Sequence, residues 1–338
     1  MNYEKNLFNA SFSHIYVEDR VANHPMVQKI SSHFRDADII RIRHYKDVFC
    51  RRRQDIAAQK HSQSLILAEK TGELVYKGSR MCQDFDNDNF YYTSCVMNCV
   101  FDCEYCYLKG MYPSSAVVIF LNLDDIFDEV SRLSGDRPVY LCVSYDTDLI
   151  ALDNLTGYTA RWAEFTSKTP NLSVEIRTKS GRCDIYDSLS PCERLIFAYT
   201  LSPDSVIDKY EHGTASLSAR INAAAYAIKR GFSVRLCFDP MIYCQNYETE
   251  YRRMVESAAA VLDFGRLRDI SLGSFRISKE YIKAMRHSYP DSPVCQFPYE
   301  TVRGICQYPA ELKSNMEDML FNLLSQHIDT TKIYRMED

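Results

Sequence analysis

The sequence has no run of about eighteen apolar residues, so it offers no candidate for a membrane-spanning helix. Its opening segment, MNYEKNLFNASFSHIYVEDR, lacks the apolar core of a signal peptide. Internal repeats and low-complexity segments are also missing. With 338 residues, 46% of them hydrophobic and 25% charged, the chain is expected to be a cytoplasmic globular protein of one large or two smaller domains.

The sequence also lacks an excess of positive charge. Its formal net charge of −5 argues against a protein that coats nucleic acid, although a local basic patch is compatible with this value. Cysteine, in contrast, is abundant, with thirteen residues. Thiols stay reduced in the cytoplasm, so ligation or catalysis accounts for them better than a disulfide framework.

Short β-rich segments alternate with helix-like segments after about residue 90. The six predicted strands are 90–95, 138–145, 172–178, 194–202, 233–239 and 267–275. Strands that alternate with helices predict parallel βα units. Six strands are too few for a complete eight-stranded barrel, so residues 86–338 are expected to form a partial (β/α)6 barrel that ends in an amphipathic helix.

The first part of the chain has a different pattern. Strand-like segments occupy residues 14–18, 37–43 and 64–70, and one helix-like segment, 24–34, lies between the first two. We therefore expect residues 1–85 to form a small α/β domain that precedes the barrel. The expected fold class of the whole chain is α/β.

Four cysteines fall within the segment CVMNCVFDCEYC, which begins at Cys95. Cys99, Cys103 and Cys106 have the spacing C-x3-C-x2-C. Three thiolates this close on one loop can hold three irons of a [4Fe–4S] cluster, which leaves the fourth iron free to bind a substrate or cofactor. Cys95 falls on the preceding predicted strand and is expected to be a buried structural thiol.

A zinc site and a chance grouping of buried thiols both stay open for these cysteines. A structural zinc ion would need four ligands, and Cys95 could be the fourth, although no second pair of closely spaced cysteines appears. The cysteines could also be buried together by coincidence. The remaining cysteines form no C-x2-C pair, so no auxiliary iron–sulfur cluster is expected.

The three-cysteine motif after a predicted strand resembles the radical S-adenosylmethionine (SAM) superfamily. The segments DCEYCYL, FLNLDDIF (120–127), TDLIALD (147–153), VIDKYEHGT (206–214) and SARINAA (218–224) resemble the spore photoproduct lyase family in particular. The resemblance follows the same order over nearly the whole chain. It implies a lyase that uses a 5′-deoxyadenosyl radical to abstract hydrogen and repair a thymine dimer lesion in DNA.

The resemblance also implies cofactors and the residues that bind them. The cofactors are a [4Fe–4S] cluster on Cys99, Cys103 and Cys106, and SAM. The implied SAM-binding residues are Tyr105, Lys179, Thr200, Ser202 and Arg220. The electron for the cluster would come from a reductase or a flavodoxin-type donor.

One position departs from the family pattern. The family's hydrogen-donating cysteine aligns, without gaps, with Tyr145 in SYDTDLIALD, and the nearest thiol is Cys142. Residues three apart in a strand face opposite sides, so Cys142 replaces that thiol only if the strand bulges or shifts its register. The implied radical relay runs through Tyr105 and Tyr107.

A basic segment, RIRHYKDVFCRRR (41–53), is a candidate DNA contact. Arginines can neutralise phosphates and aromatic side chains can stack on bases, although a charge run is often only a solvated surface. The candidate nucleic-acid-binding residues are Arg41, Arg43, Arg51, Arg52 and Arg53.

The expected function is therefore radical SAM repair of a thymine lesion. The departure at Tyr145 keeps two alternatives open. The first is a radical SAM enzyme that modifies a peptide or another small substrate. The second is a metal-bearing nucleic-acid-binding protein without catalysis.

Overall fold

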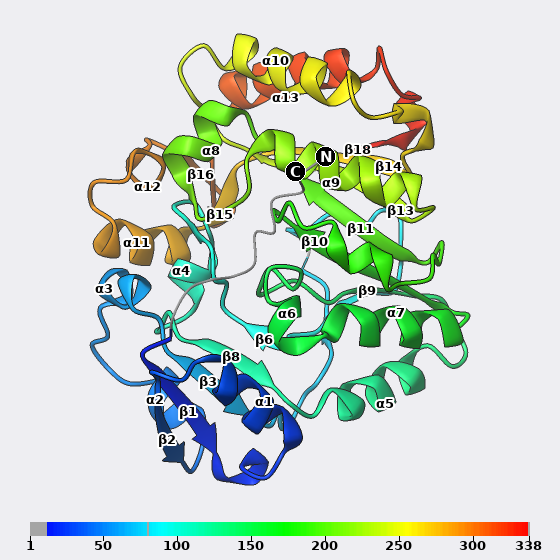
Figure 1. Ribbon diagram of the computed structural model, residues 1–338. Helices are drawn as coiled ribbons and strands as arrows, with labels where there is room; N and C mark the ends of the chain where they lie inside the picture. The colour runs from blue at the N-terminus through cyan, green and yellow to red at the C-terminus, as the bar shows by residue number, and fades with distance from the viewer. Residues whose placement is uncertain (1–11, 80, 337–338) are drawn as a thin grey trace.

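The computed structural model describes residues 12–79 and 81–336, which form two main sheets (Figure 1). The first sheet has the strand order β2-β1-β3-β8-β6. Its strands are β1 (His14–Glu18), β2 (Asp38–Ile42), β3 (Leu65–Ala68), β6 (Val96–Met97) and β8 (Val117–Phe120). The associated helices are α1 (Pro25–His33), α2 (Lys46–Phe49) and α3 (Ile56–His61).

The second sheet is the partial barrel, with the strand order β18-β14-β13-β11-β10-β9-β5-β4. The six predicted strands are confirmed as neighbouring parallel strands of this sheet. They are β5 (Phe90–Tyr92), β9 (Val139–Cys142), β10 (Leu172–Thr178), β11 (Leu195–Thr200), β13 (Ser233–Met241) and β14 (Asp269–Ser274). The edges are β4 (Tyr76–Lys77), which is antiparallel, and β18 (Ile333–Arg335), which is parallel.

Helices cover the outside of the partial barrel. The expected C-terminal helix is α13 (Ala310–Leu324), which lies beside α10 (Tyr247–Ala259) at the top of Figure 1. The other helices are α4 (Leu108–Met111), α5 (Leu123–Leu133), α6 (Asp153–Thr156), α7 (Tyr158–Lys168), α8 (Asp204–Tyr210), α9 (Leu217–Lys229), α10 (Tyr247–Ala259), α11 (Lys279–Ser288) and α12 (Pro293–Gln296).

Two small antiparallel sheets lie outside the main ones. The first joins β7 (Asp102–Cys103) to β12 (Glu211–His212), and the second has the order β15-β17-β16. The strands of the second sheet are β15 (Arg276–Ser278), β16 (Glu300–Val302) and β17 (Ile305–Gln307). These strands are only two or three residues long, and no sequence periodicity predicted them.

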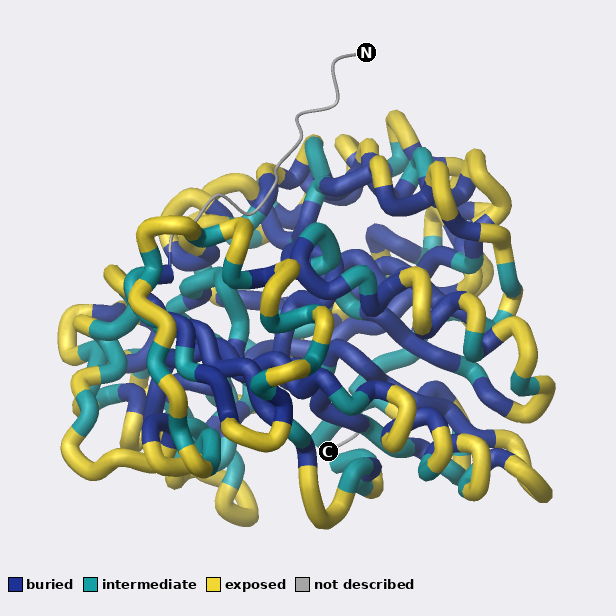
Figure 2. Tube along the Cα trace, turned by 60° about the horizontal axis from the view of Figure 1, so that its bottom comes forward, coloured by how far each residue is buried: buried dark blue, intermediate teal, exposed yellow. Residues whose placement is uncertain are grey.

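The expected division after residue 85 does not separate the two sheets. Strand β4 precedes it but pairs with β5 of the barrel, whereas β6 and β8 follow it but belong to the first sheet. One continuous cluster of buried apolar side chains includes Ile15 and Leu65 of the first sheet together with Leu236 of the barrel. Figure 2 shows buried backbone through the centre of the molecule and exposed positions around its outside. The two sheets therefore share one core.

A buried arginine joins several strands inside the barrel. Arg235 on β13 is 1% exposed and donates hydrogen bonds to the carboxylates of Glu175 on β10 and Asp269 on β14. It also donates to the hydroxyl of Tyr140 on β9, and its guanidinium lies over the ring of Phe85. Burial by itself raises the pKa of Glu175, but Arg177 and Arg235 lower that pKa below its ordinary value. Glu175 is therefore ionised, and the network pairs the positively charged Arg235 with negatively charged carboxylates.

Replacing Arg235 with Met should lower the free energy of unfolding by about 3–5 kcal/mol, because Glu175 and Asp269 would be left as uncompensated buried charges. Urea unfolding measures this loss. The control is Arg161→Met, which breaks an exposed pair with Asp124 and should cost less than about 1 kcal/mol. Equal losses in the two variants would show that the internal network does not stabilise the barrel.

Candidate active site

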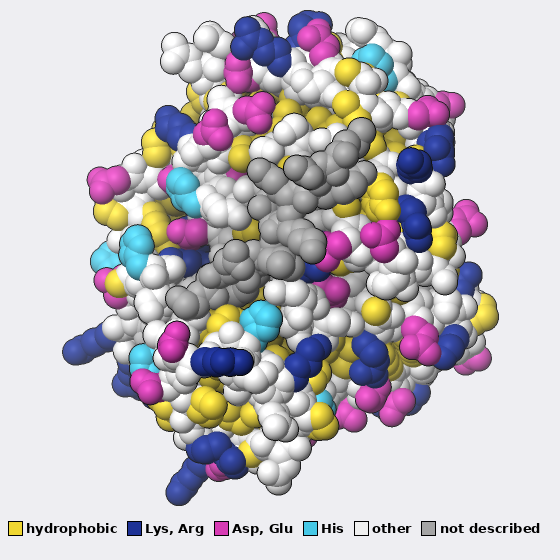
Figure 3. Space-filling view, in the orientation of Figure 1, with side chains coloured by type: hydrophobic (Ala, Val, Ile, Leu, Met, Phe, Trp, Pro, Cys, Tyr) yellow, Lys and Arg dark blue, Asp and Glu magenta, His cyan; other side chains and the backbone are white. Residues whose placement is uncertain are grey.

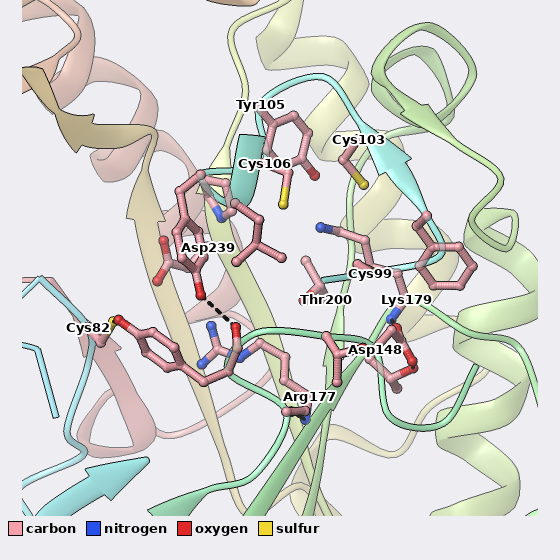
Figure 4. Close-up of a pocket in the computed structure, with 18 of the residues that line it drawn as sticks. Cys82, Cys99, Cys103, Tyr105, Cys106, Asp148, Arg177, Lys179, Thr200 and Asp239 are labelled. Atoms are coloured by element: carbon pink, nitrogen blue, oxygen red, sulfur yellow. Dashed lines mark hydrogen bonds between the residues drawn. The ribbon is translucent and has the colours of Figure 1, made fainter. Parts of the chain in front are cut away.

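One cavity of about 270 Å³ opens at the carboxyl ends of the parallel strands (Figure 4). Thr178 ends β10, Thr200 ends β11, and both line this cavity. Tyr145 and Asp148, which follow β9, line it as well. The carboxyl edge of a βα barrel is where the loops of such folds gather their catalytic groups. This cavity is therefore the candidate active site.

Cys99, Cys103 and Cys106 all line this cavity. Cys103 lies on β7, where it pairs in register with Glu211 of β12, so a short sheet fixes the middle of the loop. The ammonium of Lys60 on α3 donates to the carbonyl oxygens of Cys99, at 2.8 Å, and of Phe101, at 2.9 Å. The loop is thus held from both the barrel side and the N-terminal side.

The cysteine loop turns sharply at Asn98, whose φ of 65° lies in the left-handed region that asparagine tolerates. Its side-chain amide donates to the carbonyl oxygens of Ser114, at 2.7 Å, and Ala116, at 2.8 Å. These bonds fix the direction in which the chain enters the loop just before Cys99.

The donor set of this loop fits an iron–sulfur cluster. Cys99, Cys103 and Cys106 line the same cavity, so their side chains surround a common space. Among the described residues, no three His, Cys, Asp or Glu side chains are arranged to hold a single metal ion. A [4Fe–4S] cluster binds each cysteine through a different iron, so its ligands stand farther apart than those of one ion, and the two observations are compatible.

Cys95 lies apart from these three cysteines. It falls between β5 and β6, just beyond the strand on which it was expected, and it is fully buried. Its sulfur lies 3.7 Å from the carbonyl oxygen of Val143 and does not line the cavity. This position fits the expected structural thiol and does not fit a fourth zinc ligand beside Cys99.

Glu211 is a functional residue that the sequence reasoning missed. Its buried carboxylate accepts hydrogen bonds from the hydroxyl of Tyr105, from Arg220, and from the hydroxyl of Ser202 at 2.8 Å. The ammonium of Lys179 lies 4.0 Å from one of its oxygens. Burial by itself raises the pKa of Glu211, but Lys179 and Arg220 lower it to about 2, so this group is a carboxylate.

The residues expected to bind SAM fall in two layers around this carboxylate. Tyr105, Lys179 and Thr200 line the cavity, and the Lys179 ammonium lies 4.9 Å from the centre of the Tyr105 ring. Ser202 and Arg220 lie behind the cavity wall. Arg220 is fully buried and donates to Glu211 and to the carbonyl oxygens of Thr200 and Ala215.

Asp148 is a second residue that the sequence reasoning missed. Its carboxylate lines the cavity and accepts hydrogen bonds from the Lys179 backbone amide, at 2.7 Å, and from the Thr178 hydroxyl, at 2.9 Å. A motif segment, TDLIALD, contained this aspartate, but no sequence signal distinguished it from Asp153 in the same segment. Asp148 fixes the backbone from which Lys179 projects.

Tyr145 and Tyr107 both line the cavity and contact each other. The Tyr107 hydroxyl donates to the Tyr145 carbonyl oxygen at 2.6 Å, and the two ring centres are 5.8 Å apart. The Tyr145 hydroxyl lies 3.3 Å from the sulfur of Cys82. Burial raises the pKa of Tyr145 above its ordinary value, so the phenol keeps its proton at neutral pH.

Cys142 does not line the cavity. Strand β9 ends at Cys142, so the predicted strand 138–145 was too long at its end and its alternation does not reach Tyr145. Cys142 and Tyr145 both contribute to one apolar cluster, and of the two only Tyr145 lines the cavity. The Cys142 sulfur lies deeper, 3.9 Å from a carboxylate oxygen of Glu175.

The five candidate DNA-contacting arginines lie away from the cavity. Arg41 and the neighbouring Arg43 lie at β2, the outer edge of the first sheet, and Arg51 to Arg53 follow α2 (Figure 1). All five are exposed, and Arg41 pairs with Asp19 at 2.8 Å. Figure 3 shows basic side chains mixed with acidic ones over the N-terminal sheet, so this view has no continuous basic surface.

A partial βα barrel with a three-cysteine loop, and with a cavity at its carboxyl edge that holds Lys179 and Asp148, defines a radical SAM enzyme. A family model described as spore photoproduct lyase matches residues 11–298. The chain therefore belongs to the spore photoproduct lyase family.

Individual relatives agree with this assignment. The chain is 24% identical over 285 residues to the spore photoproduct lyase of Bacillus subtilis (strain 168), with 82% of each chain covered. It is 24% identical over 257 residues to that of Clostridium acetobutylicum, with 73% of this chain and 74% of the relative covered.

Solved structures show the same fold. A spore photoproduct lyase mutant with bound AdoMet and dinucleoside spore photoproduct superposes with a TM-score of 0.81 at 19% identity, covering 96% of this chain and 98% of the other. A spore photoproduct lyase complexed with dinucleoside spore photoproduct gives 0.80 at 18% identity, with the same coverage. The partial radical SAM barrel expected from the sequence is thereby confirmed.

Replacing Cys99, Cys103 or Cys106 with Ala should abolish cluster binding, whereas Cys95→Ala should retain about four irons per chain. The reason is that three thiols face the cavity and Cys95 does not. Iron and sulfide analysis after anaerobic reconstitution measures this, together with the visible absorption of the cluster. If Cys95→Ala loses the cluster as completely as Cys99→Ala, the assignment of ligands is wrong.

Lys179→Ala should weaken SAM binding by about 1.5–3 kcal/mol, because it removes a half-buried ammonium, a charge-assisted donor, beside Tyr105. Equilibrium titration of the cluster-loaded protein with SAM measures the effect. Lys168→Ala, which removes an exposed lysine paired with Glu164 on α7, is the matched control and should leave the affinity unchanged. Equal affinity in the two variants would remove Lys179 from the SAM site.

Proposed function

We propose that this enzyme repairs a methylene-bridged thymine dimer in DNA, the lesion named spore photoproduct. The observation that carries the proposal is a single cavity that brings the three cysteines together with Lys179 and Tyr145. The family to which the chain belongs takes its name from this reaction. Two solved relatives hold a dinucleoside spore photoproduct.

The residues of this chain have distinct tasks in the proposed reaction. Cys99, Cys103 and Cys106 would hold the [4Fe–4S] cluster. When bound, the cluster and SAM supply the radical that abstracts hydrogen from the lesion. Lys179 presents a positive charge next to the Tyr105 ring, which suits the carboxylate of SAM, while Glu211 keeps both side chains in place.

The far part of the cavity is suited to the lesion. Tyr145 and Tyr107 place two half-buried phenols there, and both can exchange a hydrogen atom with a neighbouring radical. Apolar walls, including Phe275 and Pro240, exclude water from that space. Such exclusion protects a carbon radical from side reactions.

Partners outside the cavity complete the proposal. We infer a one-electron donor of the reductase or flavodoxin type, and a cytoplasmic location. In the described part of the chain, no helix has the length and apolar character needed to cross a membrane. The exposed arginines Arg41, Arg43, Arg51, Arg52 and Arg53 are proposed to contact phosphates of DNA beyond the lesion, since they lie outside the cavity.

Anaerobic, reduced, cluster-loaded protein should convert dinucleoside spore photoproduct to two thymidines in the presence of SAM. Mass spectrometry measures the product, and 5′-deoxyadenosine should form only when the lesion is present. The controls are an undamaged thymidine dinucleotide and the Cys103→Ala variant, and neither should yield product. Formation of 5′-deoxyadenosine with the lesion left intact would contradict repair and favour a peptide or another small substrate.

A further inference from the structure

A lysine from the N-terminal part of the chain contacts the backbone of the cysteine loop. The ammonium of Lys60 on α3 donates hydrogen bonds to the carbonyl oxygens of Cys99, at 2.8 Å, and of Phe101, at 2.9 Å. Cys99 is one of the three cluster ligands, and Phe101 lies midway in sequence between Cys99 and Cys103. A positive charge therefore lies directly against the loop that holds the cluster.

The loop separates Lys60 from the active-site cavity. Lys60 does not line that cavity. It lines a narrow hollow of about 10 Å³ between α3 and α4, which Figure 1 shows near each other. Cys99 and Cys106 line both spaces. Lys60 is thus placed to influence the cluster without contacting SAM or the lesion.

No carboxylate balances the charge of Lys60 among the residues that the structure describes. The lining of the hollow includes no Asp or Glu from these residues. Lys109, the other lysine of the lining, is paired with Asp102 at 2.7 Å. A paired lysine adds little net charge to its surroundings, whereas Lys60 adds a full positive charge. Lys60 is also partly buried, so salt screens its charge less than that of an exposed lysine.

A neutral side chain shares the hydrogen-bonding task of Lys60. The amide of Gln63 donates to the same Cys99 carbonyl oxygen at 3.2 Å and to the Ser115 carbonyl oxygen at 2.9 Å. The side-chain oxygen of Gln59 accepts from the Ser115 backbone amide at 2.9 Å. The attachment of the loop to this part of the chain therefore does not depend on Lys60 alone. What distinguishes Lys60 from Gln59 and Gln63 is its charge.

We propose that Lys60 raises the reduction potential of the [4Fe–4S] cluster. Three thiolate ligands leave the cluster with a net negative charge, which grows by one unit when one electron passes to it from the donor. A fixed positive charge beside the loop stabilises this more negative, reduced state, so the potential rises. Lys60 is therefore a positioning residue that acts through the cluster loop, whichever substrate the enzyme takes.

This role gives the N-terminal part of the chain a share in the chemistry of the barrel. SAM is cleaved only by an electron from the reduced cluster. At a given potential of the donor, a cluster with a higher reduction potential is reduced in a larger fraction of the molecules. The charge of Lys60 thereby allows a weaker reductant to start the reaction.

The test is a redox titration of the anaerobically reconstituted protein, without SAM or lesion, followed by the electron paramagnetic resonance of the reduced cluster. Lys60→Gln keeps a hydrogen-bond donor but removes the charge, and Lys60→Arg keeps the charge. Lys60→Gln should lower the equilibrium constant for reduction by about tenfold, which is about 59 mV for a one-electron couple. Lys60→Arg should keep the potential of the unmodified protein.

Gln63→Met is the matched control, because it removes a hydrogen bond to the same Cys99 carbonyl oxygen without a change of charge. Its reduction potential should equal that of the unmodified protein. Iron and sulfide analysis should find about four irons per chain in all three variants. Equilibrium titration should find that SAM affinity is the same in Lys60→Gln as in the unmodified protein, since Lys60 lies outside the cavity.

Each other outcome overturns the proposal. An unchanged potential in Lys60→Gln would show that the charge has no effect. An equal shift in Gln63→Met or in Lys60→Arg would assign the effect to the hydrogen bonds or to the shape of the loop. Loss of iron from Lys60→Gln would make Lys60 a structural residue of the loop. No lesion enters the titration, so these results are independent of whether the enzyme repairs spore photoproduct.

Discussion

The buried carboxylate of Glu211 joins the cysteine loop to the barrel, and the geometry of the active site depends on it. Its backbone pairs with Cys103, while its side chain holds Tyr105 from the loop, Arg220 from α9 and Ser202 after β11. A carboxylate can be buried here because two cations surround it. The same cations lower the pKa of Glu211 to about 2, so its side chain stays ionised at neutral pH.

Much of the fold could be predicted from the sequence, because hydrophobic runs alternate with amphipathic helices after residue 90 and parallel strands are buried on both faces. Strand β8 was missed, although all four of its residues are buried, since a short apolar run at a motif does not reveal the sheet it joins. The three loop cysteines were evident from their spacing. Glu211 and Asp148 were not, because their roles arise from contacts between segments far apart in the sequence.

The contact between Cys82 and Tyr145 joins two segments that lie far apart in the sequence. The proline-free turn after β9 presents Tyr145 to the cavity, and the segment between β4 and β5 brings Cys82 to its hydroxyl. From the sequence alone, the thiol nearest to Tyr145 is Cys142, which lies three residues earlier. The structure adds a thiol 63 residues before Tyr145, which no strand pattern could place there.

The exchange of strands between the two sheets means that the N-terminal part is not a separable module. Strand β8 hydrogen-bonds on one side to β3 and on the other to β6. A chain that began at residue 86 would keep β8 but lose β3, leaving an apolar strand with an open row of backbone donors and acceptors. Such an edge is a template for pairing with another chain. The barrel and the N-terminal sheet are therefore expected to fold as one unit.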